Sequence, residues 1–329
     1  MVHNNFIQIA LNLAKQGMGY VAPNPMVGCV IVKDNAIVSE GYHQKYGEAH
    51  AEVNAIKNLS LEINPKDCTL YVTLEPCCHF GKTPPCANLI IDKGFKKVVV
   101  CNLDPNPLVA GKGIEKLKNV GIEVIIGVLE KEGRELNKHF FTFFKKKRPY
   151  YLLKWAQTAD GFISKLPVPK NRIENLIGDA EQQLQSHQLR SNIMAILVGK
   201  NTVLSDNPNL TTRLIKGKNP IRIFIDKNLE VPKSFNVYNF EAKTIVFNGI
   251  KDDVENNIEF IKLDFTKNIL DQISNKLYDL KIQSVIVEGG AFLHNSFIQQ
   301  KLFDEIIVYT NKNLKFNSGV KAPITPINL

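Results

Sequence analysis

Three potential zinc ligands, one histidine and two cysteines, constrain the fold of this chain more than any other feature of its sequence. His50 is followed two residues later by Glu52, and Cys77, which follows a proline, is separated from Cys86 by eight residues. One imidazole and two thiolates leave the fourth position of a tetrahedral zinc ion open, and zinc lowers the pKa of a water bound there to about 7. A fold that joins these side chains would form a hydrolytic zinc site, with Glu52 placed to carry protons.

Two helices are predicted to begin at this site. Apolar residues at helical spacing follow His50 over residues 51–58, and residues 86–93 predict a second helix, with Thr83 as its N-cap and two prolines in its first turn. His50 and Glu52 would then line a pocket at the N-terminus of the first helix. The partial positive charge of both N-termini favours the thiolate form of the cysteines.

A closed structural zinc site is the main alternative, because Cys78 or His79 could supply a fourth ligand. The two cysteines could also be small buried hydrophobic residues without a metal. Glu52 favours the catalytic interpretation, since a structural site has no use for a carboxylate two residues from its histidine.

A histidine, a glutamate two residues later and a subsequent Pro-Cys pair resemble the zinc-dependent nucleobase deaminases. Those enzymes usually continue as Pro-Cys-x-x-Cys, whereas this chain has the longer stretch Pro-Cys-Cys-His-Phe-Gly-Lys-Thr-Pro-Pro-Cys over residues 76–86. Together with residues 22–28, 41–43, 73–75 and 104–107, this stretch resembles the deaminase half of the bifunctional riboflavin-biosynthesis deaminase/reductases. The resemblance implies a cytidine-deaminase-like α/β/α fold for the first half.

The same resemblance implies hydrolytic deamination of 2,5-diamino-6-ribosylamino-4(3H)-pyrimidinone 5′-phosphate. Glu52 would pass a proton from water to the leaving ammonia, next to one zinc ion held by His50, Cys77 and Cys86. The residues implied around the substrate are Asn24, His43, His79, Lys82 and Asp104.

Residues 154–161, 197–203 and 206–213 resemble the reductase half of this family, so the resemblance covers nearly the whole chain. It implies a dihydrofolate-reductase-like α/β fold in which NADPH reduces the ribosyl group to a ribityl chain. The residues implied around NADPH are Ala156, Leu176, Thr202, Asp206, Gly290, Ala291, Phe292 and Leu293. Those implied around the substrate are Lys154, Arg190, Leu210, Arg213 and Glu288.

Physical chemistry supports part of this reductase assignment. Arg190 and Arg213 suit a phosphate, because a guanidinium fork matches phosphate bidentately, although surface arginines also serve solubility. Gly289 and Gly290 lie between a predicted strand and a predicted helix, where backbone N–H groups can approach a phosphate. The usual G-x-G-x-x-G dinucleotide pattern is missing.

Two positions depart from the family pattern. Glu174 and Leu176 stand where many relatives have a hydroxyl residue and an aromatic residue next to the nicotinamide and the substrate. Leu176 cannot stack on a ring, and Glu174 places a carboxylate where a phosphorylated substrate approaches. The reductase is therefore less strongly predicted than the deaminase.

Length and composition predict two domains, which we place at residues 1–147 and 148–329. Apolar residues make up 44% of the chain and charged residues 22%, as in soluble globular proteins. No apolar stretch approaches the roughly 20 residues that span a bilayer. The first residues do not resemble a signal peptide, and six scattered cysteines favour a reducing cytoplasm over a disulfide framework.

The net charge of +9 raises the question of a nucleic-acid partner. The excess of basic residues is +4 in residues 1–147 and +5 in residues 148–329, so neither half is a concentrated basic module. The only dense run, residues 145–148, suits a solvated linker, and modest basicity suits a phosphorylated small substrate. We therefore expect no nucleic acid and no membrane as partner, and the sequence leaves a homo-oligomer open.

Two other functions remain possible from the sequence. A nucleic-acid or free-nucleoside deaminase with an accessory second domain would also contain His50 and Glu52, although the long insert between the cysteines disfavours it. A zinc-stabilised binding module without activity is the other alternative.

Hydrophobic periodicity predicts a largely parallel sheet covered by helices in each half. The predicted strands are residues 27–32, 69–73, 98–101, 122–127, 150–156, 195–198, 221–225, 244–247, 284–287 and 305–309. Helices are predicted over residues 6–18 and 111–119, as one connecting helix over the phenylalanine-rich residues 130–144, and from Phe292 onward. A turn is predicted at residues 158–161. The phenylalanines are expected to pack in a core and not to stack on bases.

Overall fold

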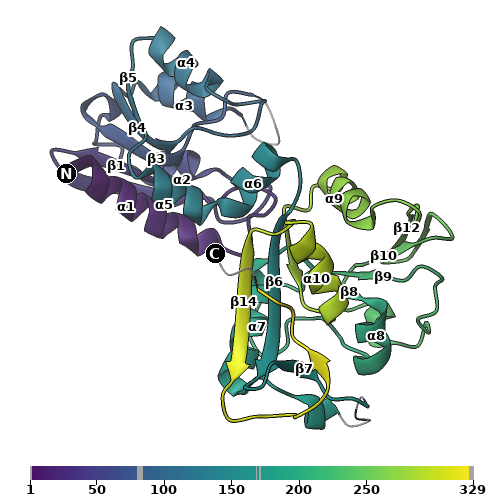
Figure 1. The fold of residues 1–329 in the computed structure, drawn as a ribbon. Helices are drawn as coiled ribbons and strands as arrows, with labels where there is room; N and C mark the ends of the chain where they lie inside the picture. Colours follow the sequence, from purple (N-terminus) through teal and green to yellow (C-terminus); the bar gives the residue numbers. More distant parts are fainter. Residues whose placement is uncertain (1, 80–83, 168, 170–171, 326–329) are drawn as a thin grey trace. The chain divides into compact units, whose positions relative to one another are not determined.

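The structure, a computed structural model, describes residues 2–79, 84–167, 169 and 172–325. It divides into two compact units, Met1–Lys146 and Lys147–Leu329. Each unit is an α/β structure built on its own central sheet (Figure 1). In the described part of the chain, no helix is both long and apolar enough to span a membrane.

The first unit contains a five-stranded sheet in the order β2-β1-β3-β4-β5. Its strands are β1 (Gly28–Lys33), β2 (Ala36–Tyr42), β3 (Thr69–Leu74), β4 (Lys97–Asn102) and β5 (Glu123–Ile126). Only β3, β4 and β5 are parallel, because β1 pairs antiparallel with both β2 and β3. The prediction of a largely parallel sheet is wrong here. Asp34 and Asn35 both have positive φ and join β1 to β2 as a tight hairpin, which the sequence analysis missed.

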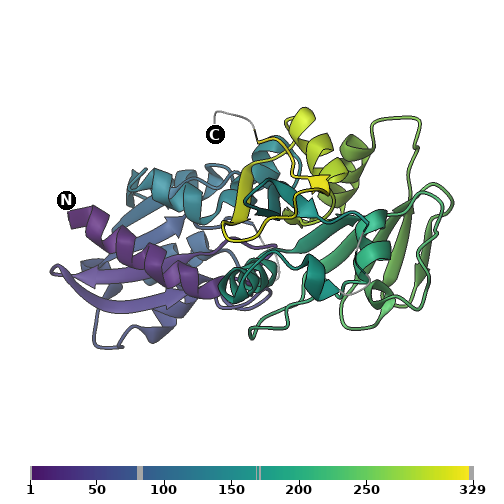
Figure 2. The ribbon, with the colours of Figure 1, turned by 60° about the horizontal axis from the view of Figure 1, so that its bottom comes forward.

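Helices cover both faces of this sheet. They are α1 (Val2–Ala14), α2 (Ala51–Asn58), α3 (Cys86–Lys93), α4 (Lys112–Asn119), α5 (Glu130–Leu136) and α6 (Lys138–Lys146), with 3₁₀ turns η1 (Lys15–Gly17) and η2 (Pro65–Asp67). Apolar side chains of α2, α3 and α4 form one core with the sheet, and those of α1 form another on the opposite face. Figure 2 shows α1 in purple next to the strands of this sheet. The first unit is thus an α/β/α sandwich.

The connecting helix predicted over residues 130–144 is two helices, α5 and α6, which meet at Asn137. The Asn137 side chain accepts a hydrogen bond from the backbone N–H of Met26 at 2.8 Å and donates one to the Met26 carbonyl at 2.9 Å. This contact between distant parts of the chain fixes the break. Phe140, Phe141 and Phe143 are buried, which confirms that they pack in a core.

The start of α3 also differs from the prediction. Pro85 is the N-cap residue and has an extended backbone, so the two prolines precede the helix and do not form its first turn. Thr83, the predicted N-cap, lies outside the described residues. Gly94 ends the helix in the left-handed conformation with φ of 80°, as a C-cap glycine commonly does.

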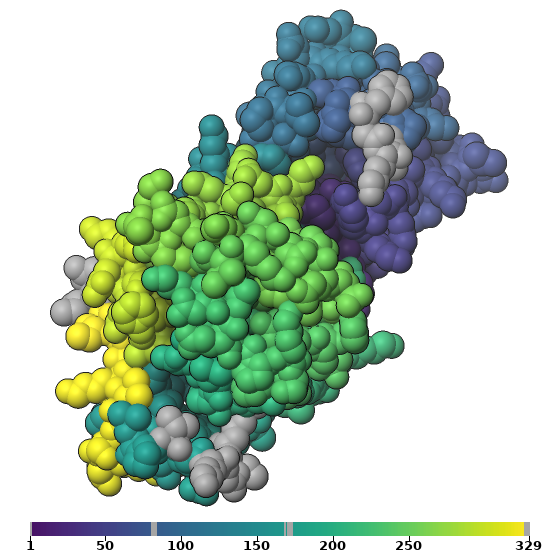
Figure 3. Space-filling view, turned by 90° about the vertical axis from the view of Figure 1, so that its right-hand side faces the viewer, coloured from purple at the N-terminus to yellow at the C-terminus, as the bar shows by residue number. Residues whose placement is uncertain are grey.

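The second unit contains an eight-stranded sheet in the order β11-β12-β10-β9-β8-β13-β6-β14. Its strands are β6 (Tyr150–Thr158), β8 (Ala195–Gly199), β9 (Ile221–Ile225), β10 (Thr244–Asn248), β11 (Asp253–Glu255), β12 (Ile258–Lys262), β13 (Ser284–Val287) and β14 (Glu305–Asn311). All neighbours are parallel except β11 and β12, which confirms a largely parallel sheet in this half. Figure 3 shows the surface over the β9 to β12 end of the sheet in green.

Helices cover this sheet on both faces as well. They are α7 (Ala180–Asn192), α8 (Lys200–Asp206), α9 (Ile269–Asp279) and α10 (Ala291–Gln299), with 3₁₀ turns η3 (Arg172–Asn175) and η4 (Asn236–Tyr238). Apolar residues of α9 and α10 pack on one face and those of α7 and α8 on the other. A small second sheet pairs β7 (Phe162–Ser164) with β15 (Val320–Lys321). The predicted turn before β7 is confirmed by a hydrogen bond from Gly161 to Thr158.

Candidate zinc and cofactor sites

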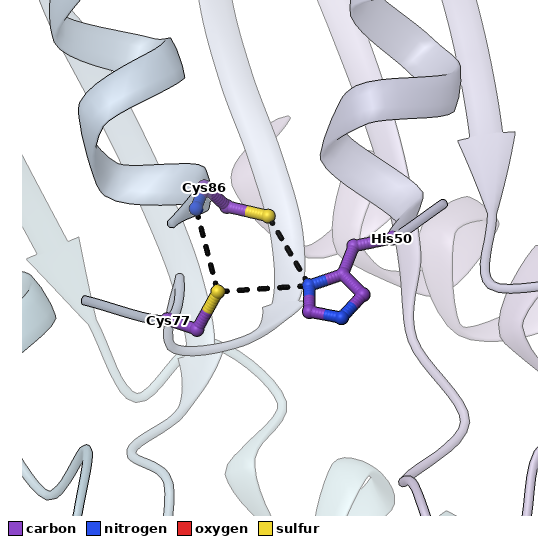
Figure 4. Close-up of side chains that lie close together, drawn as sticks. All are labelled: His50, Cys77 and Cys86. Carbon is purple, nitrogen blue, oxygen red and sulfur yellow. Dashed lines mark hydrogen bonds between the residues drawn. The ribbon is translucent and has the colours of Figure 1, made fainter. Parts of the chain in front are cut away.

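The three predicted zinc ligands converge in the first unit (Figure 4). His50 is the N-cap residue of α2, Cys77 follows β3, and Cys86 is the first residue of α3. The Nδ1 atom of His50 lies 3.6 Å from Sγ of Cys77 and 3.3 Å from Sγ of Cys86. The backbone N–H of Cys86 also donates to Sγ of Cys77 at 3.3 Å. Two helix N-termini therefore meet at these sulfur atoms.

This geometry fits a zinc ion. Zinc bonds of about 2.3 Å to sulfur and about 2.0 Å to nitrogen at tetrahedral angles place the two ligand atoms about 3.5 Å apart. All three ligand atoms lie within 4.8 Å of one another. Hydrogen bonds with Cys86 and His50 lower the pKa of Cys77, although burial alone would raise it. The lowered pKa favours the thiolate form of Cys77, which is the form that binds metal.

Glu52 lies in the first turn of α2 beside this cluster and is 3% exposed. Burial raises its pKa to about 7, although the charge of His50 opposes that shift. Its carboxyl group also hydrogen-bonds with Cys86. A buried carboxyl group with a pKa near neutrality can both accept and donate a proton during a reaction.

Asn24 and His43, two predicted substrate contacts, lie together next to the ligands. Nδ2 of Asn24 is 3.1 Å from Nε2 of His43, and Nδ1 of His43 is 3.0 Å from the carbonyl oxygen of Ala49. The ring of His43 meets that of His50 edge-on at 5.5 Å between centroids. Burial lowers the pKa of His43, and a neutral ring that donates from Nδ1 leaves Nε2 to accept from the Asn24 amide.

Asp104 follows β4, and its Oδ1 atom accepts a hydrogen bond from the backbone N–H of Asn106 at 2.8 Å. Burial raises the pKa of Asp104 to about 7, and the charges of Glu75 and Cys77 act in the same direction. Asp104 is thus close to the zinc ligands. His79 is exposed, and Lys82 lies outside the described residues.

In the second unit, Arg190 of α7 forms a bidentate ion pair with Glu288. Nε of Arg190 donates to Oε1 at 3.1 Å and Nη2 donates to Oε2 at 2.5 Å, while Nη1 donates to the carbonyl of Thr211 at 3.3 Å. Burial raises the pKa of Glu288, but the charges of Arg190 and Lys154 outweigh burial and lower it to about 2. Lys154, on β6, has its own pKa lowered by burial. These residues form one buried charged cluster.

His187 belongs to the same cluster and was missed by the sequence analysis. Its Nδ1 atom accepts a hydrogen bond from the backbone N–H of Arg213 at 2.9 Å. Burial and the charges of Arg190 and Arg213 lower the pKa of His187 to about 4. A signal was present in the sequence, because His187 precedes Arg190 by three residues and shares its face of the helix.

A second polar site lies where β13 ends and α10 begins. Gly290 has φ of 71°, which favours glycine, and α10 starts at Ala291. A Cβ atom on Gly289 would lie 2.9 Å from Oγ1 of Thr202 and 2.9 Å from Cβ of Val198. The turn therefore packs closely on α8. Its bare backbone at a helix N-terminus fits the phosphate of a nucleotide cofactor.

The other predicted reductase residues lie in varied environments. Asp206 is the last residue of α8, one turn after Thr202, and Ala156 is partly buried on β6. Leu176 is 46% exposed and Phe292 is 86% exposed, whereas Leu210 and Leu293 are buried in the cores. Glu174 is exposed.

Two family models match the chain. The zinc-binding region of cytidine and deoxycytidylate deaminases matches residues 1–102, and the RibD C-terminal domain matches residues 149–311. Riboflavin biosynthesis protein RibD of Aquifex aeolicus is 46% identical over 317 residues, which cover 94% of this chain and 86% of that protein. The protein of the same name from Bacillus amyloliquefaciens is 42% identical over 315 residues, with 92% and 83% covered.

Solved structures show the same similarity over both units. A diaminohydroxyphosphoribosylaminopyrimidine deaminase/5-amino-6-(5-phosphoribosylamino)uracil reductase from Thermotoga maritima matches with a TM-score of 0.89 and 38% identity, covering 100% of this chain and 92% of that one. One crystal form of Acinetobacter baumannii RibD matches with a TM-score of 0.89 and 32% identity, with the same coverage.

These matches confirm the predicted family and the predicted fold class of a cytidine-deaminase-like and a dihydrofolate-reductase-like domain. The His-Cys-Cys cluster of the first unit fits the zinc of the deaminase region, and the reductase domain is NADPH-dependent. The chain belongs to the RibD family of bifunctional riboflavin-biosynthesis proteins, which combine a zinc-binding deaminase with a reductase.

Proposed function

We propose that residues 1–147 deaminate a diaminopyrimidinone ribosylamine 5′-phosphate and that residues 148–329 reduce the deaminated product with NADPH. The observation that carries this proposal is the convergence of His50, Cys77 and Cys86 beside buried Glu52, in the unit that matches the deaminase region. The RibD C-terminal domain matches the other unit, which has its own sheet and its own charged cluster.

In the deamination, Glu52 moves the protons. Zinc, when held by His50, Cys77 and Cys86, supplies the activation of water for attack on the ring carbon that bears the amine. The carboxylate of Glu52 accepts a proton from that water and delivers it to the leaving group, which departs as ammonia. A pKa of about 7 suits both transfers.

The deaminase substrate is held by polar groups around the ligand cluster. The amide of Asn24 and the ring of His43 lie next to His50 and can orient the pyrimidine. Asp104 lies close enough to Cys77 for their charges to interact. His79 and Lys82, on the insert between the cysteines, complete this set and suit the phosphate.

In the reduction, the charged cluster binds the phosphorylated substrate. The charges of Arg190 and Glu288 cancel within their ion pair, and Lys154 and Arg213 add two positive charges nearby. These positive charges favour an anionic ligand such as the substrate phosphate. Leu210, also implied around the substrate, precedes Arg213 by three residues. NADPH is proposed to contact Ala156, Leu176, Thr202, Asp206 and the segment from Gly290 to Leu293. Where a side chain in this set is buried, as in Leu293, the proposed contact is made by the backbone of that residue.

Two variants of the full chain test this division of activities. We expect Glu52→Gln to abolish ammonia release and to leave NADPH oxidation with the deaminated intermediate unchanged. Arg213→Ala should leave ammonia release unchanged and weaken NADPH oxidation with the deaminated intermediate. Loss of both activities in either variant would contradict the assignment of one reaction to each unit.

The partner is proposed to be a phosphorylated small molecule and not a nucleic acid, because the basic excess is divided almost equally between the two halves. A cytoplasmic location is proposed from the cysteines. All six are free of disulfides, and three of the six are buried hydrophobic core residues outside the zinc ligand set.

A further inference from the structure

A second buried glutamate lies two residues before the zinc ligand Cys77. Glu75 follows the last residue of β3 and is 3% exposed. Its backbone N–H donates to the carbonyl of Asn102, the last residue of β4, at 2.9 Å. Glu75 is therefore fixed between the ends of two parallel strands. The loop that carries Cys77, called the ligand loop below, begins at this point.

Four backbone N–H groups of one segment, residues 104–114, donate to the carboxylate of Glu75. Its Oε2 atom accepts from Asp104 at 3.2 Å and from Gly111 at 2.9 Å. Its Oε1 atom accepts from Gly113 at 2.9 Å and from Ile114 at 3.3 Å. A buried carboxylate is stable only when its oxygens are hydrogen-bonded, and charge-assisted bonds of this kind are strong.

These contacts also cap α4 from a distance. The N-cap residue Gly111 has no side chain to accept from the first turn, and the Glu75 carboxylate takes that place at the positive end of the helix. The first turn packs directly on the ligand loop, because a Cβ atom on Gly113 would lie 2.1 Å from the carbonyl oxygen of Pro76. Sγ of Cys78 further contacts the carbonyl of Leu108 at 3.9 Å.

We propose that Glu75 is a positioning residue of the deaminase site, which fixes Asp104 relative to the zinc ligand Cys77. Glu75 holds the backbone of Asp104 with one carboxylate oxygen and shares a short loop with Cys77. One carboxylate thus sets the separation between a metal ligand and a substrate contact. The inference rests on the proposed role of Asp104 in substrate binding, and Glu75 itself touches no reacting atom.

The test is Glu75→Gln in the full chain. The change keeps the size of the side chain but turns one acceptor oxygen into an NH₂ donor that faces backbone N–H groups. We expect the KM of the deamination to rise about tenfold or more, which corresponds to about 1.4 kcal/mol of lost binding. Ammonia release at saturating substrate per bound zinc, zinc content and NADPH oxidation with the deaminated intermediate should change much less.

The variant Glu75→Asp retains the charge and should give a KM between those of the parent and Glu75→Gln. If Glu75→Gln does not fold, the KM of Glu75→Asp alone tests whether Glu75 positions Asp104. Ile7→Val, on the opposite face of the sheet, is the control for lost stability, and should lower the melting temperature without raising KM.

Two outcomes would overturn the inference: an unchanged KM in both Glu75 variants, or loss of zinc together with activity. In the first case Glu75 would only cap α4, and in the second it would only hold the metal loop. The variant Asp104→Asn tests the proposed substrate contact of Asp104 separately from the positioning role of Glu75. If that variant leaves KM unchanged, the role of Asp104 fails, whatever the Glu75 variants show.

Discussion

Glu52 and Glu75 are both buried carboxyl groups near the zinc ligands, but their surroundings suit them to different tasks. Glu52 contacts Cys86, and burial brings its pKa to about 7. Glu75 is surrounded by four backbone N–H donors. Only Glu52 is placed to exchange a proton, whereas Glu75 holds neighbouring backbone in place.

The first prediction at the residue scale concerns Glu52. Replacement by glutamine removes the proton carrier without changing the ligand set, so ammonia release should fall about 10²- to 10⁴-fold while zinc stays bound. Ammonia assays and metal analysis of the purified protein would check both parts. Unchanged turnover would show that another group moves the proton.

The second prediction concerns the substrate phosphate of the reductase. Arg213→Ala should raise the KM for the deaminated substrate at least about tenfold and leave the KM for NADPH nearly unchanged, because its guanidinium is assigned to the phosphate. Steady-state NADPH oxidation with each substrate varied in turn measures both constants. Arg134→Ala, an exposed arginine of the first unit, is the control. Equal losses for the two substrates would contradict the assignment.

At the scale of elements, local sequence predicts much of what the structure contains. The strands predicted in the second unit match β6, β8, β9, β10, β13 and β14 to within two residues. Short apolar runs between turn residues are strong signals for buried parallel strands. The convergence of His50, Cys77 and Cys86 could also be predicted, because these residue types at this spacing, with Glu52 beside the histidine, suggest one zinc site.

What local sequence could not predict depends on contacts between distant segments. β2 alternates weakly and contains Gly41, so its pairing is set by the Asp34-Asn35 turn and by β1. The break at Asn137 depends on Met26, 111 positions earlier. The charged cluster joins α7 to Lys154 on β6 and to Glu288 after β13, and no local pattern marks Thr211 as a member.

The prediction at this scale concerns the β13–α10 turn. In Gly289→Ala, the added methyl group would meet Thr202 and Val198 at 2.9 Å, so the turn must shift away from α8. The KM for NADPH should rise about tenfold, with ammonia release unchanged. Gly199→Ala is the matched control, since a methyl group there meets no atom within 4 Å. A similar effect in both variants would argue against close packing as the cause.

At the scale of the whole molecule, the three proposed zinc ligands lie in the first unit, and the segments proposed to contact NADPH lie in the second. Removal of zinc with a chelator should therefore abolish ammonia release and leave NADPH oxidation with the deaminated intermediate within about twofold. Adding zinc back should restore the first activity. Loss of both activities on chelation would show that the metal also supports the second unit.

The division at Lys146 has a consequence for synthesis of the protein. Every strand and helix of the first unit, and every zinc ligand, precedes the second unit in the chain. Ribosomes add about 5–20 residues per second and N-terminal domains fold first, so the 183 residues of the second unit take roughly 10–40 s to make. The nascent chain can therefore acquire its metal while the reductase half is still being translated.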